Sequence, residues 1–215
     1  MGGVQPFRDR YRAGHMLGRV LVDGGWNGAN PLVLALPRGG VPVAVGVAKA
    51  LDAPFDVFVV RKLGVPGHAE LAMGAIASGG IRYLDEATIE ALGIAPEAIA
   101  DVENRERREL ARREQRYRGD RPYKPIAGSD VVIVDDGIAT GASMQVAVDA
   151  IRSHEPNSVT IAVPVAPEGA DELFGDRIDA FVTCATPEPF LAVGYWYEDF
   201  GQTSDDEVIA ALHTP

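Results

Sequence analysis

The sequence lacks several features that define common protein classes. It contains one cysteine, Cys184, so no disulfide can form within the chain and a reducing compartment is expected. No apolar run approaches the roughly 20 residues that a membrane-spanning helix needs, and the N-terminus has no apolar segment of the secretory type. We therefore expect a cytoplasmic protein with no membrane partner.

Basic residues are also in short supply. The 215 residues include 20 Lys and Arg against 31 Asp and Glu, which gives a net charge of -11 at neutral pH. Non-specific nucleic-acid binding needs a basic surface that replaces phosphate counterions, so this balance predicts no nucleic-acid partner. A small anionic substrate is still compatible, because a phosphate site needs only local amides, cations or a metal.

Several familiar motifs of nucleotide-binding proteins and hydrolases are missing. No G-x-G-x-x-G lies between a strand and a helix, and neither G-K-[ST], G-x-S-x-G nor H-E-x-x-H occurs. The sequence therefore gives no motif support for a dinucleotide-dependent dehydrogenase or a P-loop enzyme.

Apolar residues make up 47% of the chain, which is enough for one packed core. Short β-branched runs alternate with helical segments, and this order predicts an α/β fold with a mainly parallel sheet flanked by helices. Strands are expected at residues 32–36, 56–60, 73–77, 81–84, 131–134, 158–163 and 178–183. Helices are expected at residues 41–51, 101–118, 142–153 and 170–174. We treat residues 1–215 as a single domain, with a core at about 30–184 and a small hood built from the two chain ends.

The expected helix at 101–118 is rich in arginine, but acids are interleaved with the arginines. Four acid–arginine pairs stand at i,i+4 in the favourable orientation. They are Asp101–Arg105, Glu103–Arg107, Glu109–Arg113 and Glu114–Arg118. This pattern favours a solvated helix over a nucleic-acid surface, since the acids largely cancel the local field.

The segment VVIVDDGIATGAS at residues 131–143 combines several features of a phosphate site. An apolar run ends in Asp135 and Asp136, and a loop with two glycines then opens a helix. Unpaired N–H groups and the positive dipole end of a helix start suit a phosphate. Two carboxylates would repel the phosphate itself, so they are expected to face sugar hydroxyls or Mg²⁺. Taken singly, the acids also fit ordinary loop residues and the hydroxyls fit helix caps.

As a whole, this segment closely resembles the phosphoribosyl pyrophosphate (PRPP) signature of type I phosphoribosyltransferases. That signature is a hydrophobic strand, two acids and a T-G-x-[ST] loop. The resemblance implies that Asp135 and Asp136 hold the ribose hydroxyls, and it leaves both open as ligands of Mg²⁺. It assigns the 5-phosphate to the loop residues Gly137, Ile138, Ala139, Thr140, Gly141 and Ser143. Gly137 stands where a bulkier residue is often found, and we expect no functional consequence.

The sequence LPRGG at residues 36–40 again lies between an expected strand and an expected helix. Two glycines after an arginine can form a backbone anion site with a cation beside it, although a tight turn explains them equally well. In type I phosphoribosyltransferases a loop at this place, often with an unusual peptide geometry, binds pyrophosphate. The resemblance therefore predicts that Arg38, Gly39 and Gly40 bind pyrophosphate.

A third segment, at residues 60–71, resembles the R-K-x-G segment of adenine-type family members. Arg61 and Lys62 are expected to end a strand, to bind pyrophosphate oxygens, and to lead into a flexible loop at residues 64–71 that closes over the reaction. Within that loop His68 and Glu70 are candidates for proton transfer, and Asp136 completes the set of catalytic candidates. The alternative is a mobile surface loop with incidental charges.

The chain ends are expected to form the base-recognising hood of the family. Residues 9–14 are expected to pair with residues 195–200 as a cap. Trp196, Tyr197 and Phe200 are candidates for stacking on a base, and ordinary packing is the alternative for each.

The resemblance implies a Mg²⁺-dependent transferase that moves the phosphoribosyl group of PRPP to a nitrogenous base or amine and releases pyrophosphate. Two rival hypotheses stay open: a non-catalytic PRPP- or nucleotide-binding regulator, and an enzyme of another class on an α/β scaffold. The acceptor is undetermined, and a homodimer is left open because family members are often dimers.

Overall fold

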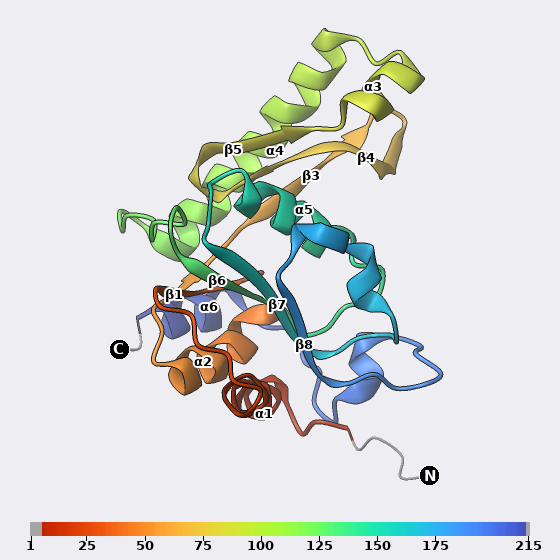
Figure 1. Cartoon of the computed structure of the whole chain (residues 1–215). Coiled ribbons are helices and arrows are strands. Elements are labelled where there is room, and N and C mark those ends of the chain that lie inside the picture. The colour runs from red at the N-terminus through yellow and green to blue at the C-terminus, as the bar shows by residue number, and fades with distance from the viewer. Residues whose placement is uncertain (1–5, 214–215) are drawn as a thin grey trace.

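The computed structural model describes residues 6–213, except for the side chains of Ala69 and Glu70. Its centre is a five-stranded sheet in the order β2-β1-β6-β7-β8 (Figure 1). In that order the strands span Phe55–Val57, Pro31–Ala35, Asp130–Val134, Ser158–Val165 and Ala180–Ala185. Every neighbouring pair is parallel, which confirms the predicted α/β class with a mainly parallel sheet.

Helices cover both faces of this sheet (Figure 1). One face carries α1 (Arg10–Asp23), α2 (Gly40–Leu51) and α6 (Asp205–Leu212), and the other carries α5 (Ala142–Arg152). Side chains of a strand alternate between the faces, so Val132 and Val134 pack toward α1 and α2 while Ile133 packs toward α5. Because both faces are covered, β6 is apolar from Val131 to Val134, and this apolar run is why the strand can be predicted from the sequence.

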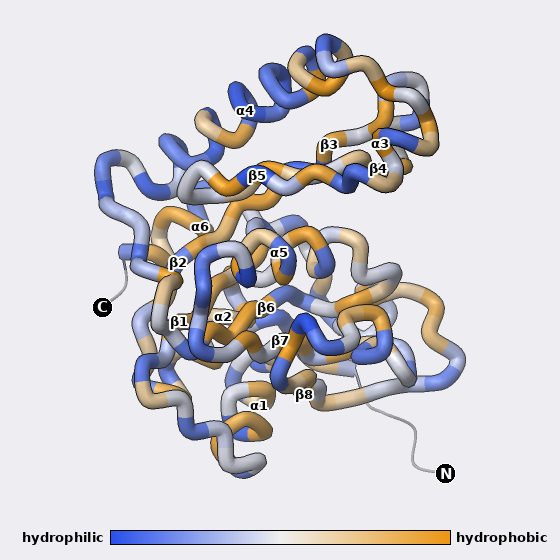
Figure 2. The backbone as a smooth tube through the Cα atoms, turned by 45° about the horizontal axis from the view of Figure 1, so that its top comes forward, coloured by the Kyte–Doolittle hydropathy of each residue, from blue (hydrophilic) through white to orange (hydrophobic). Residues whose placement is uncertain are grey.

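A second layer, here called the arm, is inserted between β2 and β6. It consists of an antiparallel sheet in the order β3-β4-β5 and two helices. Its elements are β3 (Val60–Val65), β4 (His68–Ala77), the 3-10 turn η1 (Ser78–Gly80), β5 (Ile81–Leu84), α3 (Glu86–Leu92) and α4 (Pro96–Arg118). The expected strand pair at 73–77 and 81–84 is therefore confirmed, although β4 begins earlier. Figure 2 shows α4 as hydrophilic over most of its length, with more hydrophobic segments beneath it.

The ion pairs of α4 differ from the expected set. Glu103–Arg107 and Glu109–Arg113 form, with N–O distances of 2.6 and 2.9 Å. Arg118 instead turns inward and pairs with the buried Asp56 of β2. The helix is solvated on one side only, since Val102, Leu110 and Tyr117 are buried.

The strand expected at 56–60 is divided between the two layers. The N–H of Phe58 still donates to Ala35 in β1 at 2.9 Å, whereas the N–H of Val59 donates to the Ser78 hydroxyl of the arm at 2.9 Å. The chain therefore leaves the main sheet at this point. The helix expected at 170–174 is a 3-10 turn, η2 (Ala170–Leu173), followed by another, η3 (Gly175–Arg177).

Helix α1 was not predicted, and it packs unusually close to α2. Asp9 caps it by accepting a hydrogen bond from the N–H of Arg12 at 2.7 Å. A Cβ atom on Gly14 would lie 2.2 Å from the carbonyl oxygen of Val43, and one on Gly46 would lie 2.5 Å from the backbone of Gly14. Only glycine permits this crossing, which brings the start of α1 beside the loop that precedes α2.

The two chain ends do pair, and residues 7–8 extend the expected N-terminal segment. The N–H of Phe7 donates to the carbonyl of Trp196, and the N–H of Glu198 donates back to Phe7, both at 2.8 Å. Residues 7–8 form the backbone pairing, while the expected segment 9–14 contributes Arg10 of α1, whose guanidinium stacks on the Phe200 ring. The C-terminal part of this hood contains the 3-10 turn η4 (Val193–Trp196). Within residues 6–213 no helix has both the length and the apolarity to cross a membrane.

Candidate active site

Asp135 and Asp136 stand at the carboxyl edge of the main sheet, directly after β6. The N–H of Asp136 donates to Oδ1 of Asp135 at 2.8 Å. Burial raises the pKa of both carboxyl groups, and the charge of Asp136 raises the pKa of Asp135 further. Two desolvated neighbouring acids are a costly arrangement that persists only where something offsets their charge.

The loop that follows these acids ends at the start of α5. Gly141 is the N-cap of α5 with φ of 74°, a left-handed conformation that glycine adopts without strain. Ala139, Thr140 and Ser143 are exposed. Ile138 is buried and its N–H donates to the carbonyl of Val165 in β7 at 3.0 Å, so this residue anchors the loop and does not offer its N–H to a ligand.

The loop after β1 lies directly against the two acids. Its Pro37–Arg38 peptide bond is cis. A Cβ atom on Gly39 would lie 2.1 Å from Oδ2 of Asp136, and one on Gly40 would lie 2.6 Å from the carbonyl oxygen of Val134. The structure thus brings the LPRGG loop and the acidic loop together, because β1 and β6 are neighbours in the sheet.

The side chain of Arg38 reaches the start of α6. Its Nη1 lies 3.7 Å from Oδ1 of Asp205, which also accepts a hydrogen bond from the Tyr117 hydroxyl at 2.9 Å. Arg38 is nearly half exposed. An anion bound over Gly39 and Gly40 would compete with Asp205 for this guanidinium.

Arg10, which sequence reasoning missed, pairs with Asp136. Its Nε lies 2.8 Å from Oδ2 of Asp136, and its guanidinium carbon lies 3.8 Å from the centroid of the Phe200 ring. Tyr197 is buried and donates its hydroxyl to the carbonyl oxygen of Asp136 at 2.6 Å. Tyr197 and Phe200 therefore enclose Arg10 and Asp136, an arrangement that differs from the expected platform for a base. Trp196 packs in the hood cluster with Phe7.

The hood also explains the glycine that follows the two acids. A Cβ atom on Gly137 would lie 2.6 Å from Cγ1 of Val193 in η4. The expectation that this glycine has no functional consequence is thus incomplete, because the absence of a side chain at Gly137 lets Val193 of the hood pack against the acidic loop. No local sequence signal reveals this contact or Arg10, because both partners are distant in the chain.

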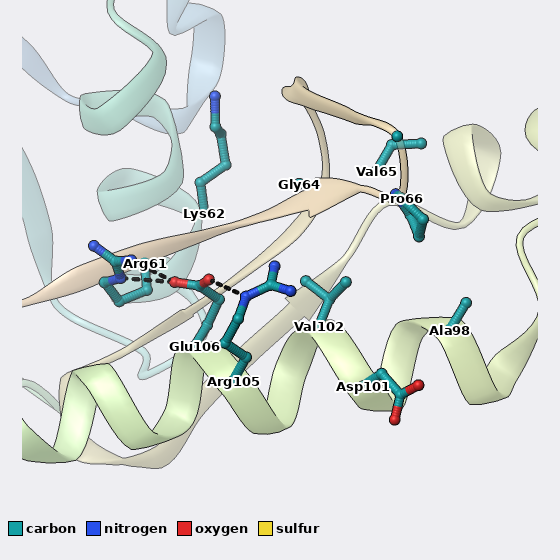
Figure 3. Close-up of a pocket in the computed structure, with 11 residues that line it drawn as sticks. Arg61, Lys62, Gly64, Val65, Pro66, Ala98, Asp101, Val102, Arg105 and Glu106 are labelled. Atoms are coloured by element: carbon teal, nitrogen blue, oxygen red, sulfur yellow. Dashed lines mark hydrogen bonds and ion pairs between the residues drawn. The ribbon is translucent and has the colours of Figure 1, made fainter.

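Arg61 and Lys62 lie within β3 and not at its end, so their side chains point to opposite faces of the strand (Figure 3). Arg61 faces α4, where its Nε bonds Oε2 of Glu106 at 2.9 Å, in a pocket of about 620 Å³ that also contains Arg105. Lys62 borders this pocket too, and it also lines a second pocket of about 410 Å³ together with Ala142 at the start of α5. The structure therefore places Lys62, and not Arg61, in a pocket that reaches the first turn of α5.

The comparisons with known proteins agree with this geometry. A family model described as the phosphoribosyl transferase domain matches residues 13–189. The chain belongs to this family. A protein of Mycobacterium tuberculosis H37Rv, provisionally named a phosphoribosyl transferase, is 47% identical over 209 residues, which cover 97% of this chain and 47% of that protein. The chain spans about half the length of the curated relatives that it matches at this identity.

Two further proteins place this phosphoribosyl transferase domain among its relatives. The crystal structure of TT1426 from Thermus thermophilus has a TM-score of 0.86 and 42% identity, and covers 97% of this chain and 98% of its own. The transcriptional regulator GfcR of Haloferax volcanii is 25% identical over 166 residues, or 77% of this chain and 60% of the regulator.

In this phosphoribosyl transferase domain the expected closing loop at 64–71 is largely a β-hairpin. β3 ends at Val65 and β4 begins at His68, so only the turn Pro66–Gly67 separates them, with Gly67 at φ of 80°. His68 is exposed at this tip. The side chain of Glu70 lies outside the described part of the chain, so its candidacy as a proton-transfer group stays a prediction.

Proposed function

We propose that this domain transfers the 5-phosphoribosyl group of PRPP to a nitrogenous base or amine and releases pyrophosphate. The observation that carries the proposal is the contact between the loop after β1 and the loop after β6, with Gly39 against the carboxylate of Asp136. One short span of the sheet edge thereby offers a backbone anion site, two carboxylates and a helix start. PRPP carries a pyrophosphate, ribose hydroxyls and a 5-phosphate in the same spatial order as these three groups. Family membership supports the same assignment.

In the proposed reaction the acceptor nitrogen forms a bond to C1 of the ribose. The bond between C1 and the pyrophosphate oxygen breaks, the electron pair leaves with pyrophosphate, and the proton lost by the acceptor nitrogen passes to the departing pyrophosphate or to water. The exposed residues Thr140 and Ser143 at the start of α5 hold the 5-phosphate. Asp135 and Asp136 accept hydrogen bonds from the ribose hydroxyls and orient C1 toward the acceptor. Arg38 and Lys62 stabilise the charge that develops on the leaving group.

Mg²⁺ fits the chemistry of this site. Asp135 and Asp136 supply the oxygen ligands that Mg²⁺ prefers, and a cation would offset the burial and the repulsion by Asp136 that together raise the pKa of Asp135. Within residues 6–213, leaving aside the side chains of Ala69 and Glu70, no group of three or more acidic, Cys or His side chains is arranged to hold a metal, so PRPP oxygens would complete the coordination. When bound, the ion would neutralise charge on the pyrophosphate.

A pocket at the neighbouring strand ends is suited to the acceptor. It has a volume of about 590 Å³ and is lined by Pro167 and Glu168 after β7 and by residues 187–190 after β8. Phe190 offers an aromatic ring and Glu168 and Glu188 offer hydrogen-bond acceptors. Residues 187–190 thus replace Trp196, Tyr197 and Phe200 as the proposed wall of the acceptor pocket.

The second candidate function is a non-catalytic regulator that binds PRPP or a nucleotide. The observation in its favour is the name of the Haloferax volcanii relative, which is a transcriptional regulator. Both functions require the same site, so ligand binding does not separate them. Release of pyrophosphate does.

The proposal is tested by calorimetric titration with PRPP, with and without Mg²⁺, followed by a screen of purines, pyrimidines and simple amines for pyrophosphate release. Asp136→Asn should weaken PRPP binding at least tenfold, while the exposed matched control Asp171→Asn should bind as the native protein does. Release with one acceptor class supports the transferase. Mg²⁺-dependent binding with no release by any acceptor favours the regulator, and unchanged affinity in Asp136→Asn contradicts both.

A further inference from the structure

Arg10 connects the N-terminal helix α1 to the acidic loop after β6, although the two are far apart in the sequence. Its guanidinium is held by three groups: Oδ2 of Asp136 at 2.8 Å, the carbonyl oxygen of Gly201 at 2.7 Å, and the face of the Phe200 ring at 3.8 Å from its centroid. The side chains of Arg10 and Asp136 are only 11% and 16% exposed. A partly desolvated ion pair of this kind is fixed in geometry, unlike the mobile pairs of a protein surface.

The identity of the cation matters at this position. A guanidinium is planar, so it can bond a carboxylate and a carbonyl at its edge while an aromatic ring covers its face. A lysine ammonium would keep the charge but lose the stacking and one directed hydrogen bond. The three contacts therefore specify arginine and not merely a positive charge.

The position of Arg10 is set by the body of the protein and by the hood together. The backbone contact of Gly14 with Val43 fixes α1 on α2, and the hydrogen bonds between Phe7 and residues 196–198 fix the segment before it. Phe200 and Gly201 follow those hood residues in the chain. Displacement of the hood would therefore also displace the partners of Arg10.

Asp136 is held on several sides by these same elements. Arg10 bonds its carboxylate, the Tyr197 hydroxyl bonds its backbone carbonyl, and Gly39 lies directly against Oδ2. The orientation of this carboxylate is thus decided by residues from α1, the hood and the loop after β1. Its charge is also offset within the chain, before any ligand or metal arrives.

We propose that Arg10 is a positioning residue for the ribose of PRPP, acting through Asp136. This inference rests on the proposed function, because it assumes that Asp136 meets the ribose hydroxyls. Arg10 itself does not touch the ligand. Loss of Arg10 weakens binding of the sugar, whereas the phosphate at the start of α5 is bound as before.

The test compares three ligands on four proteins by calorimetry or by ³¹P NMR titration. The ligands are PRPP, ribose 5-phosphate and inorganic phosphate. The proteins are native, Arg10→Met, Arg10→Lys and the control Arg19→Met, which changes an exposed arginine of the same helix. Arg10→Met should weaken PRPP and ribose 5-phosphate about tenfold and leave inorganic phosphate within twofold. Arg10→Lys should fall between Arg10→Met and the native protein, and Arg19→Met should match the native protein.

A double variant separates action through Asp136 from a direct effect. In the Asp136→Asn background, Arg10→Met should cause no further loss of ribose 5-phosphate affinity, because its route of action is already gone. A full additional tenfold loss would overturn the inference. So would native PRPP affinity in Arg10→Met, or an equal loss for all three ligands in a protein that unfolds at the native midpoint.

Failure of this inference is distinguishable from failure of the proposed function. If Asp136→Asn binds PRPP as the native protein does, the proposed ribose site is wrong. If Asp136→Asn loses PRPP but Arg10→Met does not, the site stands and the role of Arg10 is wrong. Should Arg10→Met fold poorly, Arg10→Lys carries the same comparison, since equal affinities of Arg10→Lys and Arg19→Met for ribose 5-phosphate would contradict a role for the guanidinium.

Discussion

The carboxyl edge of the main sheet and the arm differ in how their charged side chains are buried and paired. At the sheet edge, the two acids that follow β6, Asp135 and Asp136, are both desolvated, and one arginine, Arg10, pairs with Asp136. Along α4, partly buried acids pair with more exposed arginines, and the two kinds of charge neutralise one another. The sheet edge therefore presents two buried carboxylates with, among the described residues, a single partner cation, whereas the charges of α4 form a series of pairs along the helix.

The pKa values follow the same division. Burial is the main reason that the pKa of Asp135 lies well above its usual value. Hydrogen bonds from Arg112 and Arg113 lower the pKa of Glu109 to about 2. Perturbation by desolvation is the more informative of the two, because an acid kept at a cost in stability points to a function.

The largest expected effect concerns Asp56, where the arm is fastened to the main sheet. Asp56→Asn leaves the guanidinium of Arg118 buried without its counterion, although Arg118 still bonds the Val57 carbonyl at 3.1 Å and stacks on Tyr123. Breaking a buried pair in this way costs about 3–5 kcal/mol of unfolding free energy. Urea unfolding measures it, and a loss below about 1 kcal/mol would mean that this pair does not anchor the arm.

Next in size is a change at the contact between the two loops. Gly39→Ala places a methyl group where Oδ2 of Asp136 now lies, so we expect about 1–3 kcal/mol of destabilisation and loss of PRPP binding. Native PRPP affinity in Gly39→Ala would show that the two loops do not form one site.

A smaller effect, of the opposite sign, is expected at Asp135. Because its pKa is raised in the folded protein from the usual value of 3.8, the native state binds the proton more tightly than the unfolded state. Stability therefore falls as the pH rises from the unfolded pKa to the raised one, and then levels off. Asp135→Asn removes this loss, so its unfolding midpoint should exceed the native one at pH 7, with a difference that shrinks toward pH 4. A difference independent of pH would contradict this origin.

The smallest effect is expected on the exposed face of α4. Glu109→Gln removes the partner of Arg112 and Arg113, whose side chains are 60% and 31% exposed. Surface pairs contribute about 0–1 kcal/mol, so unfolding at pH 7 should change by less than about 1 kcal/mol and PRPP affinity should not change. A larger loss of unfolding free energy would contradict the view that the ion pairs of α4 contribute little to stability.

The features that can be predicted from the sequence are those whose interacting residues lie close together in the chain. β6 and the loop after it are contiguous. An apolar strand followed by two acids and a glycine-containing helix start can therefore be recognised without knowledge of the rest of the fold. Arg10 illustrates the opposite case, because its partners Asp136 and Phe200 are brought to it only by tertiary packing. Arg61 and Lys62 lie between these extremes: their residue types point to an anion, but their opposite orientations depend on the strand continuing through them.

The most direct test of the account is a crystal structure of the protein with PRPP. We predict the 5-phosphate at the start of α5 beside Thr140 and Ser143, with the ribose against Asp135 and Asp136. The pyrophosphate should lie over Gly39 and Gly40. PRPP bound instead between β3 and α4, in the pocket that contains Arg61 and Arg105, would contradict the central claim.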